Sequence, residues 1–409
     1  MQVAVIASGQ PQSGALERVL VTRFPCPLAS ECTMPTQLCR DLNISFPLMA
    51  FTRGPDAVAE VSLAGGLGVQ AAIGFSPDDL KRALDRIATR LNGQPWGLDV
   101  VMPSGFSTPD GDKASGGGMA AASDYRKMLP KEHIEFLDNL LMQYGVPALP
   151  PGTSVQNAMA EWTDAVSRKQ VQIGLEYGPS VIANALGTPP ADVVEECHRR
   201  GVKVAALVGT AEHARRHVAG GVDIVVAQGT EAGGHTGEIA SMVLVPEVVD
   251  AVGSTPVVAA GGIACGRQMV AALALGAQAV WTGSMWLTTI EGQIDAAVTS
   301  KLIKAGSSDT IRSKAITGKY ARQLKTKWTE AWENPSNPNP LPMPMQFLLT
   351  AEAVERIHRH AKETGNVDLV AAPVGQIVGR LNELRPAAEV IAEMKAEYHA
   401  TLAALRAIG

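Results

Sequence analysis

Aromatic residues and cysteines are both scarce in this sequence. Aromatic residues make up 4% of the 409 positions, so the core must consist mainly of small and β-branched side chains. Close packing of such side chains is typical of parallel strands covered by helices. The five cysteines are an odd set without a C-x-x-C pair. We therefore expect neither a disulfide framework nor a thiolate zinc site. We expect the protein to lie in the reducing cytoplasm.

Long runs of one residue class are also missing. No window of about 18 residues is continuously apolar, and the start MQVAVIASGQ lacks a basic segment before its short apolar stretch. No long run of Lys or Arg occurs, and the net charge is −5. A nucleic-acid partner is therefore not expected. We expect a soluble protein that binds neither nucleic acid nor a membrane.

The composition is that of a folded protein. Hydrophobic residues make up 46% and charged residues 18% of the chain, which argues against long disorder. The length fits two or three domains, or one barrel of about 250 residues with additions.

From about Ser45 the sequence alternates short β-branched runs with amphipathic helical patterns, as repeated βα units do. Pro77–Leu91 is one such helical pattern, with Ser76 in position to cap it. Eight candidate strands can be counted, and they predict a closed (β/α)8 TIM barrel of the α/β class. The candidates are Phe46–Phe51, Gly68–Ala72, Trp96–Val101, Val171–Glu176, Val202–Val208, Ile224–Ala227, Val257–Ala260 and Ala279–Thr282.

Three segments lie outside this pattern. Residues 1–33 have no clear periodicity and are predicted to be an extension of a barrel that spans residues 34–290. Residues 103–168 are predicted to be an insertion after the third strand, Gly-rich at first and helical later, over the barrel mouth. Residues 291–409 are predicted to be a helical lid, with helices in 290–330 and 350–406 and a Pro-rich connector between them.

In a βα barrel, reactive residues lie on the loops after the strands, because the strands themselves are committed to packing. After the sixth candidate strand the chain reads Gln228-Gly-Thr-Glu-Ala-Gly-Gly-His235. The glycines, which include Gly233 and Gly234, allow a ligand to approach the backbone closely. His235 is the group in this loop that titrates near neutral pH, so we expect it to act as a base.

Two further glycine turns follow the seventh and eighth candidate strands. Gly261 and Gly262 follow the seventh, and Gly283 and Ser284 follow Trp281 and Thr282 at the end of the eighth. Barrel enzymes often hold a phosphate on backbone N–H groups at this pair of turns. The two turns therefore predict a phosphate site.

Other motifs favour structural roles. The G-x-G-x-x-A pattern at Gly66 follows a helical stretch and leads into a strand, which is the reverse of a dinucleotide site, so a helix cap is favoured. Cys265 has no His or Asp nearby in sequence and is interpreted as a packing residue. No zinc-binding or hydrolase motif occurs, and no metal site is expected.

The run AQGTEAGGHTGE, followed by VVAAGGIACGRQMVAALALGAQAVWTGSMWLTT, resembles the FMN-dependent nitronate monooxygenase family, formerly called 2-nitropropane dioxygenases. The resemblance covers roughly residues 34–100 and 170–385, and it includes FPLMA, AGGLG and GQIVG. It implies a TIM barrel with a smaller helical domain, bound FMN, and a catalytic base near the flavin at the position of His235.

The resemblance also implies which residues contact FMN. Met49 and Ala50 match the strand position against the flavin ring, and Gln228, Gly233 and Gly234 match the loop after the sixth strand. The phosphate turns are matched by Gly261, Gly262, Trp281, Thr282, Gly283 and Ser284.

The sequence departs from the family pattern close to the substrate. Asp99 stands where the family usually has Asn, and an acid there would oppose a negatively charged reduced flavin unless it is paired or protonated. Pro373 stands where some members have Ser, and the insertion after the third strand is unusually long.

The expected reaction is oxidation of a nitroalkane or nitronate, in which electrons pass to FMN and then to dioxygen. An alternative is an FMN-dependent enoyl-thioester reductase that uses NAD(P)H, because such reductases share the E-A-G-G-H-x-G motif. A binding protein without catalytic activity is a third interpretation. The sequence leaves the physiological substrate and a homodimeric state open.

Overall fold

The computed structural model describes residues 36–102, 129–150 and 164–408. The chain divides into two units, Met1–Thr33 and Met34–Gly409. The predicted extension and the Gly-rich part of the predicted insertion lie outside the described residues. Among the helices that are described, none combines the length and apolar character that a membrane span requires.

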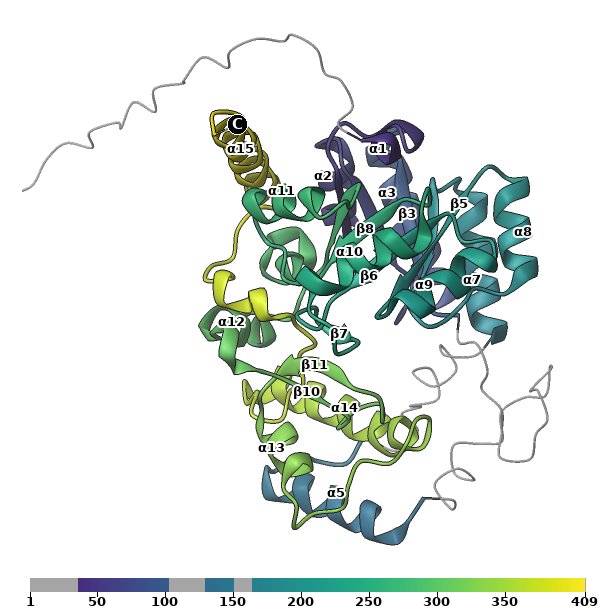
Figure 1. Ribbon diagram of the computed structural model, residues 1–409. Coiled ribbons are helices and arrows are strands. Elements are labelled where there is room, and N and C mark those ends of the chain that lie inside the picture. The colour runs from purple at the N-terminus through teal and green to yellow at the C-terminus, as the bar shows by residue number, and fades with distance from the viewer. Residues whose placement is uncertain (1–35, 103–128, 151–163, 409) are drawn as a thin grey trace, which may run out of the picture. The chain divides into compact units, whose positions relative to one another are not determined.

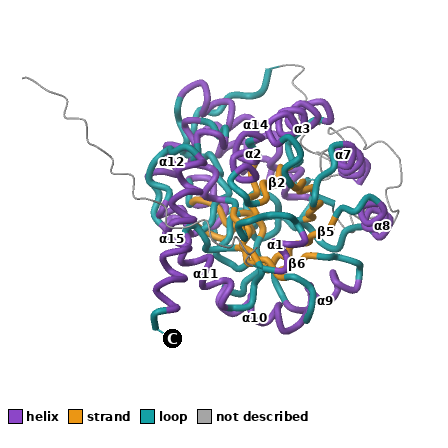
Figure 2. Tube along the Cα trace, turned by 90° about the horizontal axis from the view of Figure 1, so that it is seen from above, coloured by secondary structure: helices purple, strands orange, loops and turns teal. Residues whose placement is uncertain are grey.

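Eight parallel strands close into a barrel, and helices lie outside the ring of strands (Figures 1 and 2). This architecture is a (β/α)8 TIM barrel, as the sequence predicts. The strands, in their order around the barrel, are β1 (Leu48–Thr52), β2 (Leu67–Ala71), β3 (Trp96–Val100), β4 (Val181–Asn184), β5 (Lys203–Val208), β6 (Ile224–Gln228), β8 (Val257–Ala260) and β9 (Ala279–Thr282).

Side chains alternate between the inside and the outside of the barrel because successive residues of a strand point to opposite faces. Met49 and Trp281, which are paired between β1 and β9, belong to the cluster inside the barrel, as does Val226. Leu48 precedes Met49, and Val225 precedes Val226. Both Leu48 and Val225 belong to the cluster beneath the helices. The strand register therefore decides which side chains can reach a ligand at the barrel mouth.

A short helix closes the amino-terminal end of the barrel. In α1 (Gln37–Asp41), Leu38 and Cys39 are fully buried and join the cluster inside the barrel. The N–H of Leu38 also donates to the Oε1 of Gln278, one residue before β9, at 2.8 Å.

The predicted fourth strand, Val171–Glu176, is wrong. These residues are the end of helix α7 (Asp164–Glu176), and the fourth strand is β4, which begins five residues later. Alternating Val171, Ile173 and Leu175 suggested a strand, but Ser167, Gln170 and Gly174 are also buried, at helical spacing. Gly174 brings α7 close to β3, since a Cβ there would lie 2.3 Å from Leu98 Cδ2.

The helices of the barrel wall follow their strands. Ser76 caps α3 as predicted, since its Oγ accepts a hydrogen bond from the Asp79 N–H at 3.1 Å. The helices are α2 (Pro55–Leu63), α3 (Pro77–Leu91), α7, α8 (Ala191–Arg199), α9 (Ala211–Ala219), α10 (Ser241–Val252) and α11 (Gly266–Ala274).

The C-terminal region divides between the barrel wall and a smaller group of elements. Helix α15 (Ala387–Arg406) packs against α11 and α2, so it is part of the wall, although the sequence predicts a lid. Residues 290–330, predicted to be helical, also contain two strands, β10 (Thr310–Ser313) and β11 (Ala321–Leu324). The other elements are α12 (Ala296–Lys304), α13 (Lys327–Glu333), α14 (Met345–Thr364) and the short 3-10 helices Ser284–Thr288, Ile290–Gly292, Ser307–Asp309 and Gln376–Arg380.

The predicted insertion contributes a helix to this smaller group. Helix α5 (Lys131–Gln143) packs against α14, and its Leu140 and Leu141 share a buried cluster with Trp328 and Trp332 of α13 (Figure 1). Strand β7 (Gly234–His235) pairs with β11, which pairs with β10, so the loop after β6 joins a second sheet.

Candidate active site

Polar and aromatic side chains predicted to contact a cofactor lie on the inner face of the barrel. Gln228 is the last residue of β6, in alternation with the inward Val226, and Trp281 lies near the end of β9 beside Met49 of β1. Ligands of TIM barrels bind at these carboxyl ends of the strands. Met49, Gln228 and Trp281 therefore lie at the end of the barrel where a ligand is expected.

Asp99 also points inward, because its neighbours Leu98 and Val100 lie in the outer cluster. Its register partners on β2 and β4 are Ala71 and Ala183. Asp99 is 2% exposed, and among the described residues its carboxylate has no hydrogen-bond or ion-pair partner. Burial raises its pKa to about 7.

Ala50 and Thr282 lie elsewhere. They are register partners, and Ala50 belongs to the cluster beneath the helices, so both side chains point out of the barrel. The Thr282 hydroxyl donates to the Met49 carbonyl at 3.4 Å and accepts from Trp286 Nε1 at 3.1 Å. Only the backbones of Ala50 and Thr282 are left to face a ligand inside the barrel.

The two glycine turns lie side by side, because β8 and β9 are adjacent. Gly261 and Gly262 both have positive φ, +98° and +72°, as successive glycines tolerate. Among the described residues, no acceptor is present for the backbone N–H groups of Gly262, Ile263, Gly283 or Ser284. Unpaired N–H groups gathered in this way can bind a phosphate.

Side chains of neighbouring residues fix the shape of both turns. Gln268 of α11 donates to the Gly262 carbonyl at 2.6 Å and accepts from the Ala264 N–H at 2.8 Å and from the Cys265 thiol at 3.3 Å. The Ser284 hydroxyl accepts a hydrogen bond from the Gly375 N–H at 2.8 Å. Ser284 thus holds the C-terminal segment against its turn, a role that the sequence did not predict. Cys265 is buried, as expected of a packing residue.

The loop after β6 is equally constrained. A Cβ on Gly233 would lie 2.7 Å from the backbone of Val374 and Gly375, so only glycine allows this close approach. The Glu231 carboxylate accepts from the N–H and hydroxyl of Ser241 at 3.1 and 2.8 Å, and so caps α10. Gly234, with φ +77°, then turns the chain into β7.

His235 lies in β7, opposite Ala321 of β11. Its Nε2 is 2.8 Å from the hydroxyl of Thr317, which orients the ring. Burial, and to a smaller extent the charge of Lys319, lower the pKa of His235 to about 4. The imidazole is therefore neutral at physiological pH and able to accept a proton.

Residues 310–324 supply the groups around His235 that the sequence did not indicate, because this segment was predicted to be helical. Gln323 is 1% exposed and lies on the same face of the small sheet as His235, two residues beyond Ala321. Its amide nitrogen and oxygen both lack a hydrogen-bond partner. Gln323 also pairs with Pro373, the position at which some relatives were expected to have Ser. No pattern in the sequence singles out Gln323.

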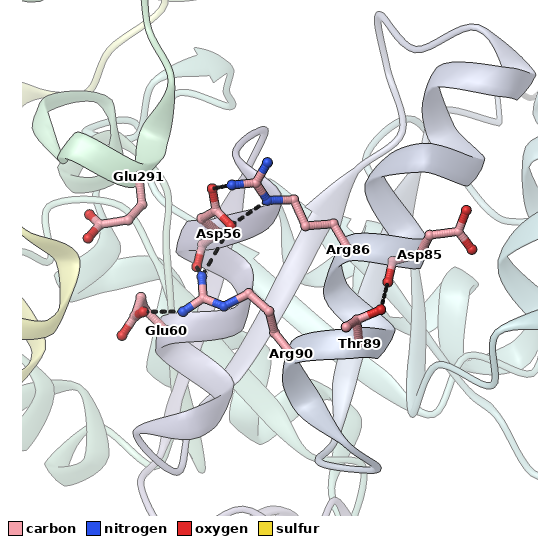
Figure 3. Close-up of a pocket in the computed structure, with 7 residues that line it drawn as sticks. All are labelled: Asp56, Glu60, Asp85, Arg86, Thr89, Arg90 and Glu291. Atoms are coloured by element: carbon pink, nitrogen blue, oxygen red, sulfur yellow. Dashed lines mark hydrogen bonds and ion pairs between the residues drawn. The ribbon is translucent and has the colours of Figure 1, made fainter.

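A surface depression lies outside the barrel, between α2, α3 and Glu291 (Figure 3). Its charges are largely paired with one another, since Asp56 contacts Arg86 at 2.6 Å and Arg90 at 3.2 Å. It contains none of the residues predicted to contact a cofactor, so we do not assign the chemistry to it.

Comparison with known proteins decides the family. The nitronate monooxygenase family model matches residues 37–397. The chain belongs to the nitronate monooxygenase family. It is therefore a flavin-dependent oxidoreductase, in agreement with the geometry described above.

Three proteins to which the chain is similar show how far the similarity extends. A candidate monooxygenase of Mycobacterium tuberculosis, Rv1533, is 46% identical over 92% of this chain and 99% of its own length. The nitronate monooxygenase of Paraburkholderia phytofirmans is 28% identical over 88% of this chain and 92% of its own. The solved structure of nitroalkane oxidase from Streptomyces ansochromogenes has a TM-score of 0.71 and 26% identity, and the match covers 90% of this chain and 99% of that one.

Proposed function

We propose that this protein is an FMN-dependent enzyme that oxidises a nitronate, or the nitroalkane from which the nitronate forms, with dioxygen. The adjacent turns after β8 and β9, with four backbone N–H groups that have no described acceptor, carry the proposal. They suit the phosphate of FMN. Membership of the nitronate monooxygenase family supports the choice of substrate.

Several other predicted residues point into the barrel beside these turns, where the ring of a bound flavin would lie. Gln228, Trp281 and Met49 line the inner face of the barrel beside them, and Asp99 lies on the inner face of β3. Gly229, Gly233 and Gly234 present no side chain in the loop after β6. When bound, FMN supplies the redox chemistry by taking electrons from the substrate and passing them to dioxygen.

In this proposal His235 removes the α-proton of a neutral nitroalkane. Its ring is uncharged above about pH 4, and Thr317 fixes its orientation through Nε2. A positioned base of this kind contributes about 10²–10⁴-fold to the rate. A nitronate has already lost this proton, so its oxidation depends on His235 much less.

The test is the His235→Ala variant. We expect it to retain FMN and to lose about 10²–10⁴-fold in kcat/KM for a neutral nitroalkane, with a much smaller loss for the pre-formed nitronate. His213→Ala, on the exposed side of α9, is the control and should leave both rates unchanged. Undiminished rates of the His235 variant on both substrates would remove His235 from the mechanism.

An anaerobic mixing experiment tests the choice of reaction. Rapid bleaching of the flavin by a nitronate, and not by NAD(P)H, supports the monooxygenase. Rapid bleaching by NAD(P)H would instead favour the enoyl-thioester reductase. A purified protein that is colourless and takes up no FMN would reject both.

A further inference from the structure

Asp99 is the one carboxylate that strand alternation places on the inner face of the barrel among the described residues. The other inward positions near the carboxyl ends of the strands hold apolar side chains or the amide of Gln228. An aspartate that is 2% exposed and unpaired is costly to keep ionised. Such a group is stabilised either by a bound ligand or by taking up a proton.

No described charged side chain faces Asp99 to compensate its charge. The strands packed against β3 present Ala71 from β2 and Ala183 from β4 at its level. Desolvation is the cause of its raised pKa, and no charged group, His235 and Lys319 included, contributes. This raised pKa brings proton exchange on the carboxyl into the physiological pH range.

We propose that Asp99 takes up a proton when the bound flavin is reduced, and so keeps the net charge of the site constant. This inference rests on the proposed function. Reduction brings two electrons and one proton to the ring and leaves it with one negative charge. Asp99 takes a second proton from solvent by forming an O–H bond on its carboxylate, and it releases that proton when the electrons leave for dioxygen.

The consequence of this exchange is that, above about pH 7, the flavin ring and Asp99 together carry one negative charge in both states. With the ring oxidised the charge is on Asp99, and with the ring reduced it is on the ring. An Asn at this position cannot exchange a proton, so the total charge of such a site would change on reduction.

The Asp99→Asn variant tests the proposal, because Asn has nearly the same shape as Asp. The midpoint potential of the flavin in the holoenzyme would be measured between about pH 7 and pH 9. One extra proton per two electrons changes the reduction equilibrium tenfold per pH unit, or 29.6 mV. We expect the wild-type potential to fall more steeply with pH than that of Asp99→Asn, by this amount. His235 does not titrate in this window, since its pKa is about 4.

A second readout detects the proton directly. Infrared difference spectra of reduction at pH 8 should show a new carboxylic-acid carbonyl band, which shifts in D₂O and is absent from Asp99→Asn. Asp85→Asn is the matched control, because Asp85 is an exposed residue of α3 that pairs with the hydroxyl of Tyr177. It should behave as the wild type in both measurements.

The outcomes separate this inference from the proposed function. Equal slopes and no carboxylic-acid band in a protein that binds FMN and oxidises nitronates would overturn the role of Asp99 alone. A protein that binds no FMN would overturn both. A steeper slope together with a band that disappears in Asp99→Asn would support the inference.

Discussion

His235 is partly buried, and the charge of a lysine acts on it. Burial accounts for most of the lowering of its pKa, and the charge of Lys319 adds to the effect. A base must be unprotonated to act, so the rate on a neutral nitroalkane should fall as the pH drops through about 4. An unperturbed histidine would lose activity near pH 6.5.

Replacing Lys319 should move this acid limb. In Lys319→Met the repulsion on a protonated ring is gone, so the pKa of His235 should rise and the limb should shift upward, by less than about one pH unit. The measurement is the pH profile of kcat/KM with a neutral nitroalkane. Lys314→Met is the control, since Lys314 packs on the Tyr320 ring at 4.7 Å. A limb that stays in place in Lys319→Met contradicts this account.

Gln323 offers a second residue-scale prediction. Both of its amide atoms are buried without partners, an arrangement that costs about 1–3 kcal/mol per group in other proteins. Gln323→Leu should therefore leave the free energy of unfolding of the FMN-free protein unchanged or raise it by about 1 kcal/mol. If the amide serves the ligand site beside His235, the same variant should bind FMN or substrate more weakly.

The matched control is Gln346→Leu. Gln346 is fully buried too, but it donates to the Ala315 carbonyl and accepts from the Leu341 N–H, each at 2.9 Å. We expect this variant to lose stability, because both backbone partners are left unpaired. Urea unfolding and FMN titration measure the two effects. Equal destabilisation by both substitutions would show that the Gln323 amide is structurally satisfied.

At the scale of elements, Gly266 sets the contact between α11 and α15. A Cβ there would lie 2.1 Å from the Tyr398 N–H nitrogen and 2.4 Å from the Met394 carbonyl oxygen, both backbone atoms of α15. Gly266→Ala should therefore push α15 away and lower the free energy of unfolding by about 1–3 kcal/mol. Gly306→Ala, whose Cβ would come no closer than 3.4 Å to Asp309 Oδ2, should change it little. Similar values for the two variants, measured in urea, would refute the close contact.

The elements also show what the sequence could and could not predict. Seven of the eight barrel strands are recognisable, because β-branched runs followed by amphipathic helices are local patterns. The apolar residues of Val171–Glu176 fit the periodicity of a strand as well as that of a helix. Only the packing of this segment on β3 shows that it is a helix. Strands β10 (TIRS) and β11 (ARQL) contain polar and charged residues in place of the apolar runs of the barrel strands, so they were not recognised.

At the scale of the whole molecule, the glycine turns and His235 were recognised as candidate site residues from the sequence, because each stands in one short motif. Thr317, Lys319 and Gln323 were not, because they belong to a segment about 80 residues later, whose strand β11 pairs with the strand of His235. The same holds for α5, which packs against α14 across more than 200 residues of sequence. Contacts between distant segments leave no pattern in a single sequence.

The position of α15 has a consequence for the order in which the barrel is completed during synthesis. Chains are made from the N-terminus, and domains can begin to fold as they emerge. The eight strands are finished at Thr282, but the wall between α11 and α2 is filled by Ala387–Arg406. The hydrogen bond from the Gly375 N–H to the Ser284 hydroxyl likewise forms only after Gly375 has been made. The strands of the barrel are therefore made before the helix that covers this side of it.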